Sequence, residues 1–255
     1  MPAGLLDKIM MNLINTKSFE LAIYAKGDED AIKLAIVIPG RLDTKDYVHN
    51  TSHVDYLASK GYYAVSFDPP GTWESPGSIE LHTTTNYLKA VNELIEYFGN
   101  KPTLLVGHSR GGTVSILASG NPVVFGVAAI MATYGEPSAP SEEDLKLGYH
   151  LSYRDMPPGT ERTKEQKRFE LPFTYFEDGQ KYDPVSVLKK LTKPKLLIYG
   201  DNDEFTRPER VEEVFAAIPE PKMKLKVKSD HDYRLHPDII EEVNQTIGKF
   251  LDKYE

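Results

Sequence analysis

Short apolar runs alternate with amphipathic stretches along most of the chain. A short continuous apolar run predicts a buried strand, and apolar residues recurring every three or four positions predict a helix. Strands are predicted at 19–25, 33–38, 63–67, 103–106, 124–131, 195–199 and 223–227. Helices are predicted at 46–59, 83–98, 113–118, 208–217 and 237–251. Because apolar strands joined by helices are buried on both faces, we expect an α/β fold: a mostly parallel central sheet with helices on both faces.

The first sixteen residues carry apolar side chains at a spacing that predicts an amphipathic helix folded against the domain. Asp7 and Lys8 interrupt the apolar run, so it does not predict a signal peptide. Nowhere does the chain approach the roughly 18 consecutive apolar residues of a membrane span. We therefore expect no stable membrane insertion.

Residues 136–192 depart from the strand–helix alternation and are rich in proline, charged and aromatic residues. A stretch of this length inside a compact domain is usually functional. We expect residues 1–255 to form a single domain in which a lid at about 136–192 is inserted between two strands.

The amino-acid composition and net charge exclude several classes of protein. The 255 residues are 40% hydrophobic and 27% charged, which is typical of a soluble globular domain. The net charge of −8 argues against a nucleic-acid partner. The absence of cysteine excludes disulfides, thiolate metal sites and a cysteine nucleophile. It also fits a reducing cytoplasm, which is the location we expect; the oligomeric state is not readable from the sequence.

A serine stands in a glycine-rich turn between the predicted strand 103–106 and the predicted helix 113–118. The segment reads Gly107-His108-Ser109-Arg110-Gly111. A turn this sharp strains the backbone of Ser109 and requires small residues two positions away on either side. The following helix start offers free backbone N–H groups to a developing anion. The motif therefore predicts an exposed nucleophilic hydroxyl.

This strand–turn–helix resembles that of the α/β-hydrolase superfamily, and the resemblance covers nearly the whole chain outside the insertion. In that family the chain order is nucleophile, acid, histidine. The family's acid follows the strand predicted at 195–199, commonly three residues after a glycine, which indicates Asp203. Asp201 and Glu204 are the alternatives in the same loop. A carboxylate is needed to hold the imidazole in one tautomer and to stabilise the imidazolium.

The resemblance places the histidine just after the last strand, where Asp230-His231-Asp232 follows residue 227. His231 is the expected general base, because a histidine with an ordinary pKa can accept a proton near neutral pH. His236 is the alternative, but it begins the final predicted helix.

Two backbone N–H groups are expected to form the oxyanion hole. The resemblance implies the N–H of Arg110, which follows the nucleophile, and that of Arg41 in the loop after the strand 33–38; Leu42 is the next candidate. Here Pro39 replaces the histidine common in the family, which leaves the backbone donor available. The segment Asp68 to Ser75 is similar to a family segment whose role is mainly structural.

The pattern predicts a serine hydrolase that cleaves a small carboxylic ester through an acyl-enzyme intermediate, with no cofactor. The alternatives on the same triad are thioester hydrolysis, amide or peptide hydrolysis, and acyl transfer, because the fold alone does not distinguish them. The other class is a non-catalytic binding module that keeps the fold. Substrate-binding residues are not identifiable; we expect specificity to reside in residues 136–192.

Two further features are relevant to ligand binding. His49 and His53 lie four residues apart on a predicted helix, a spacing that places two metal-ligating side chains on one face. No third ligand is evident, so we expect both at the surface and no metal site. The side chains of Arg41 and Arg110 flank the predicted oxyanion hole, where they would hold an anionic substrate group or pair with acids such as Asp43.

Overall fold

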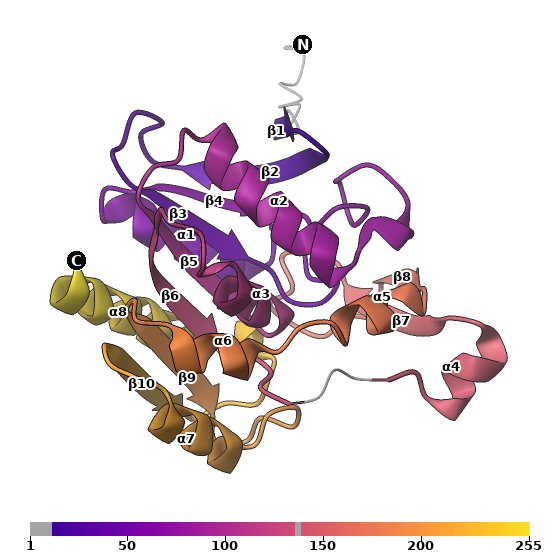
Figure 1. Cartoon of the computed structure of the whole chain (residues 1–255). Helices are drawn as coiled ribbons and strands as arrows, with labels where there is room; N and C mark the ends of the chain where they lie inside the picture. The colour runs from indigo at the N-terminus through magenta and orange to yellow at the C-terminus, as the bar shows by residue number, and fades with distance from the viewer. Residues whose placement is uncertain (1–11, 136–138) are drawn as a thin grey trace, which may run out of the picture.

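The computed structural model describes residues 12–135 and 139–255. Within them an eight-stranded sheet has the order β1-β2-β4-β3-β5-β6-β9-β10 (Figure 1). β1 pairs antiparallel with β2, and β2 pairs antiparallel with β4. The other six strands of this sheet, in the order β4-β3-β5-β6-β9-β10, run parallel to one another. The strands are β1 (Asn12–Asn15), β2 (Glu20–Lys26), β3 (Leu34–Ile38), β4 (Tyr63–Phe67), β5 (Thr103–His108), β6 (Val124–Ile130), β9 (Lys195–Gly200) and β10 (Lys222–Val227).

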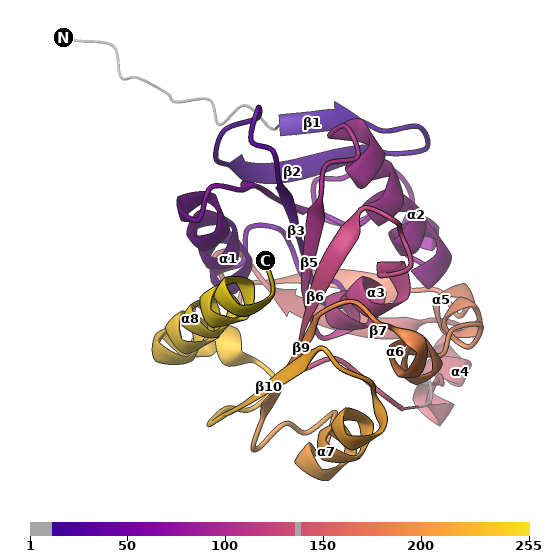
Figure 2. The same cartoon turned by 60° about the vertical axis from the view of Figure 1, so that its left-hand side comes forward.

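Helices cover both faces of the sheet (Figure 2). One face carries α1 (Val48–Ser59) and α8 (Pro237–Tyr254), and the other carries α2 (Thr84–Tyr97), α3 (Arg110–Ala118), α6 (Pro184–Lys190) and α7 (Pro208–Ala217). Successive side chains of a strand point to opposite faces of the sheet. Ile36 packs against the side covered by α2, α3, α6 and α7, and Val37 packs against the side covered by α1 and α8. This two-sided burial requires the continuous apolar runs of the sequence, and the predicted fold class is confirmed.

The amino-terminal prediction is wrong in part. Residues 12–15 form the edge strand β1, paired antiparallel with β2, rather than the end of a helix. Pairing with the edge of the sheet has overridden the local periodicity. Residues 1–11 lie outside the described part of the chain. None of the helices in the described part combines the length and apolar character needed to cross a bilayer.

The described part of the insertion, residues 139–192, contains α4 (Glu142–Leu147), β7 (His150–Asp155), β8 (Gln166–Leu171), α5 (Thr174–Gly179) and α6. β7 and β8 form an antiparallel hairpin beside the main sheet (Figure 1). A small apolar cluster joins β8 and α5 to Leu42, which follows β3. The insertion thus packs against the loop at the carboxyl end of the central strands.

Candidate active site

Ser109 occupies the tip of the turn between β5 and α3, with φ 52° and ψ −119°. This conformation is strained for a residue with a side chain. Its N–H donates to the carbonyl of Ile130 at 2.8 Å, which ties the turn to β6. A Cβ on Gly107 would overlap the carbonyl of Gly111, and one on Gly111 would overlap that of Ile38. Both glycines are therefore required by close backbone packing, as the sequence predicts.

Three polar side chains from distant parts of the chain meet at this turn. Ser109 Oγ lies 2.8 Å from His231 Nε2, and His231 Nδ1 lies 3.0 and 3.1 Å from the two carboxylate oxygens of Asp203. Asp203 follows β9 and His231 follows β10. Parallel strands end at the same edge of a sheet, so the loops after β5, β9 and β10 converge there.

The Asp203 carboxylate is buried and well supplied with donors. Its Oδ1 accepts backbone N–H groups of Phe205 at 2.8 Å and Thr206 at 3.1 Å. Burial raises the pKa of Asp203, but the hydrogen bond and charge of His231 and these two N–H groups outweigh burial, so its pKa lies below the ordinary value. Asp203 is therefore ionised at neutral pH and orients the imidazole.

The alternative residues lie elsewhere. Asp201 is exposed, and Glu204 accepts the backbone N–H of His231 at 3.2 Å instead of contacting the ring. His236 precedes α8, and its 41% exposed side chain pairs with Asp230. Of the residues considered from the sequence, only Asp203 and His231 are joined to Ser109 in the described part of the chain.

Arg110 is the first residue of α3, and Arg41 lies in the loop after β3. This loop turns tightly, because Asp43 N–H donates to the Gly40 carbonyl at 3.2 Å. Asp68 supports the next residues of the loop: its Oδ1 accepts Thr44 Oγ1–H and the Lys45 N–H, both at 2.8 Å. The structural role implied for the segment beginning at Asp68 thus takes a specific form, the bracing of the loop that carries Arg41.

A cavity of about 900 Å³ opens above Ser109 and His231. Its wall mixes arginine and aromatic side chains, including Arg41, Arg110, Tyr134, Arg154, Tyr175 and Phe205. Arg154 pairs with Asp43, whereas Arg110 bonds to Thr84 and lies over the ring of Tyr175 at 5.4 Å. This volume lies within the range of pockets that bind small molecules.

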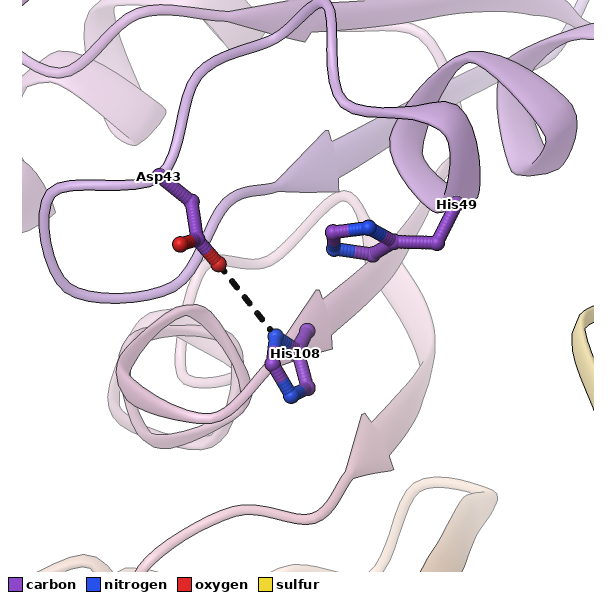
Figure 3. Close-up of side chains that lie close together, drawn as sticks. All are labelled: Asp43, His49 and His108. Carbon is purple, nitrogen blue, oxygen red and sulfur yellow. Dashed lines mark hydrogen bonds and ion pairs between the residues drawn. The ribbon is translucent and has the colours of Figure 1, made fainter. Parts of the chain in front are cut away.

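The expectation that His49 and His53 are surface residues is wrong: both are fully buried. His53 is satisfied by Asn244 at 2.6 Å and Tyr233 at 2.7 Å. His49 instead faces Asp43 and His108 (Figure 3). Burial lowers the pKa of His53 to about 4 and that of His108 to about 3. From the sequence His108 is only a residue of the turn that carries Ser109; the signal that could have singled it out is a titratable side chain at the end of an apolar strand.

A further buried histidine provides a test of stability. His82 stacks on Tyr175, and neither ring nitrogen has a hydrogen-bond partner among the described residues. Burial, reinforced by the charges of Arg110 and Arg41, lowers the pKa of His82 to about 3. In an unfolded chain the pKa of histidine is about 6.5, so as the pH falls the unfolded state takes up the proton first.

We therefore expect the stability associated with neutral His82 to be complete above about pH 6.5 and to fall by about 1.4 kcal/mol per pH unit until about pH 3. His82→Phe keeps an aromatic ring on Tyr175 and removes the titration. Relative to wild type it should gain about 2 kcal/mol on going from pH 8 to pH 5. Urea unfolding at the two pH values measures this difference, and an equal difference at both would contradict the argument.

A parallel sheet, a strained serine between strand and helix, and an imidazole and carboxylate from later strand ends define the class of protein with the α/β-hydrolase architecture. A family model described as "Alpha/beta hydrolase family" matches residues 35–243, and the chain belongs to this family.

Among individual proteins, the chain is 24% identical over 213 residues to the mouse (Mus musculus) palmitoyl-protein thioesterase ABHD10, mitochondrial, covering 78% of this chain and 68% of the relative. The solved structure of mouse alpha/beta hydrolase domain-containing protein 10 is similar with a TM-score of 0.73 and 20% identity, over 95% of this chain and 98% of that one. Est1E from Butyrivibrio proteoclasticus, bound to ferulic acid, has a TM-score of 0.72 and 20% identity over the same shares. These similarities support hydrolase activity at the level of the family.

Proposed function

We propose that the protein is a serine hydrolase that cleaves a carboxylic ester in two steps. Ser109 Oγ attacks the carbonyl carbon while His231 Nε2 takes its proton, which then passes to the leaving alcohol. Water, activated by the same nitrogen, hydrolyses the acyl-enzyme and releases the acid. The observation that carries the proposal is the continuous hydrogen-bonded series from Asp203 through His231 to Ser109.

The oxyanion that forms during each step needs donors. We assign this role to the backbone N–H groups of Arg110 and Arg41, since Arg110 begins the helix behind the nucleophile and Arg41 lines the same cavity. The loop of Arg41 is held by Asp68, so the second donor depends on packing rather than on the arginine side chain.

The insertion at 136–192 is proposed to act as a lid that selects the substrate. Arg154, Arg162 and Tyr175 of its described part line the cavity above the serine. The substrate is proposed to be a small molecule that binds without a cofactor. Cytoplasmic localisation stays a prediction.

A thioester is the second candidate substrate, because the mouse relative is named a palmitoyl-protein thioesterase. Thioester and ester share the acyl-enzyme and differ only in the leaving group. Amide hydrolysis and acyl transfer are further alternatives on the same triad, and a non-catalytic role would require the hydrogen-bonded series to be inactive.

The proposal is tested by trapping the nucleophile and by comparing leaving groups. A fluorophosphonate probe should add to the protein once, and peptide mass spectrometry should locate the adduct on Ser109. Matched butyrates of p-nitrophenol and of a thiol should then both be hydrolysed, with the better substrate defining the class. Absence of both labelling and turnover would favour the binding module, whereas product carrying an added alcohol instead of water would indicate acyl transfer.

A further inference from the structure

Asp43, His49 and His108 bring three metal-ligating groups together beside the triad (Figure 3). Asp43 lies in the loop after β3, His49 in the first turn of α1 and His108 at the end of β5. All three side chains are buried, and one ligand atom of each lies within 4.8 Å of the other two. The group is distinct from the residues proposed to carry out ester hydrolysis.

The hydrogen bonds of His108 leave one nitrogen facing a carboxylate. Its Nε2 lies 3.0 Å from the carbonyl oxygen of His231, which can only accept, so Nε2 carries the proton. In the neutral ring Nδ1 then presents a lone pair, and it points at Asp43 Oδ2 at 3.4 Å. Asp43 Oδ1 is paired with Arg154, which favours the ionised carboxylate. Two acceptors therefore face one another, an arrangement that a bound cation would stabilise.

His49 supplies an independent observation. Its ring is completely buried, and neither nitrogen has a hydrogen-bond partner among the described residues. Buried polar groups normally find a partner, so an unpaired imidazole that faces two other ligand atoms is suited to bind an ion together with them. Gly40 also leaves space there, because a Cβ at that position would lie 2.5 Å from Asp43 Oδ2 and 3.3 Å from His108 Nδ1.

We propose that Asp43, His49 and His108 bind a divalent transition-metal ion of the zinc type. Two imidazoles and one carboxylate suit such an ion better than Mg²⁺ or Ca²⁺, which prefer oxygen ligands. The 3.4 Å between His108 Nδ1 and Asp43 Oδ2 is close to the roughly 3.3 Å between ligands of a tetrahedral zinc at about 2.0–2.1 Å. The His49 ligand atom lies within 4.8 Å of the other two, so its ring would move inward by at most about 1.5 Å to complete the set.

The site adjoins the substrate cavity. Asp43 and His108 both line this cavity, so an ion held by them would lie beside the space above Ser109. Arg154 on the outer oxygen of Asp43, and the His231 carbonyl on Nε2 of His108, hold the two ligands from behind. Metal on Nδ1 would strengthen the hydrogen bond from Nε2 to the His231 carbonyl, which connects the ion to the backbone of His231 through one ligand.

The test uses the full chain, freed of metal by a chelator and then titrated with Co²⁺ and with Zn²⁺. We expect one equivalent to bind, with the visible absorption of Co²⁺ in a low-symmetry site and its displacement by Zn²⁺. His49→Gln and Asp43→Asn should each weaken binding by at least about 100-fold. His53→Gln is the matched control, because His53 lies on the same helix one turn later and its ring bonds to Asn244 and Tyr233 instead.

Wild-type protein that takes up no equivalent of either metal overturns the proposal, whatever the variants do. Binding that survives in both His49→Gln and Asp43→Asn, or that is lost equally in a folded His53→Gln, also overturns it. Circular dichroism establishes whether each variant is folded. Ser109→Ala should bind the metal as wild type does, so the site can be present even if the proposed hydrolysis fails.

Discussion

Ser109→Ala is expected to lower kcat for a p-nitrophenyl ester by about 10³- to 10⁶-fold. The reason is that Ser109 Oγ belongs to the one hydroxyl that bonds to His231 Nε2 in the described structure, at 2.8 Å. Its removal leaves no nucleophile at this turn to form the proposed acyl-enzyme. The proposed oxyanion donors are backbone N–H groups, so they would remain in the variant and would sustain a small residual rate. The measurement is initial-rate kinetics at saturating ester, together with loss of fluorophosphonate labelling.

A second serine on the same helix provides the control. Ser115 is buried in α3 and donates to the carbonyl of Gly111 at 2.8 Å, without contact to His231. Ser115→Ala should retain kcat within a few-fold, while both variants keep the circular dichroism spectrum of wild type. Ser109→Ala activity within tenfold of wild type would show that another residue is the nucleophile.

The sheet and its helices could be predicted because burial on two faces leaves a continuous apolar run in every central strand. β4 and α7 have the predicted bounds, and α8 extends to Tyr254 beyond the predicted end at 251. The edge strand β1 was missed, since it is only partly buried and depends on pairing with β2. The hairpin of β7 and β8 was equally hidden, because most residues of its two strands are polar or charged and no continuous apolar run marks them.

The candidate triad could be predicted from the sequence for a different reason. The family's chain order of nucleophile, acid and histidine restricts each of the three residues to the end of one predicted strand. What the order could not supply was the environment of the other histidines. Burial of His49 depends on α1 packing against β3, β4 and η2 (Tyr233–Leu235), which brings its ring against those of His108 and Tyr233, residues far apart in sequence. A pair of histidines on a helix gives no sign of whether its face meets the core, so Asp43 and His108 could be recognised as neighbours of His49 only from the fold.

Asp203→Asn is expected to lower kcat by about 10⁴-fold with little change in KM. Oδ1 of the asparagine can still accept the N–H groups of Phe205 and Thr206, so the loop should keep its shape. The amide nitrogen then faces His231 Nδ1 and donates a hydrogen bond to it, which places the proton of the neutral ring on Nε2. A protonated Nε2 has no free lone pair and cannot accept the proton of Ser109. The loss is therefore in the tautomer and charge of the imidazole, not in substrate binding.

Asp201→Asn is the matched control, because Asp201 lies two residues earlier in the same loop and is exposed. It should leave kcat within about twofold of wild type, as expected for a surface change away from the reacting atoms. Since the pKa of Asp203 lies below its ordinary value, wild type should keep the carboxylate ionised from neutral pH down past the ordinary range of aspartate. If Asp201→Asn is instead the inactive variant and Asp203→Asn is nearly normal, the acid has been assigned to the wrong residue and the loop after β9 must rearrange when substrate binds.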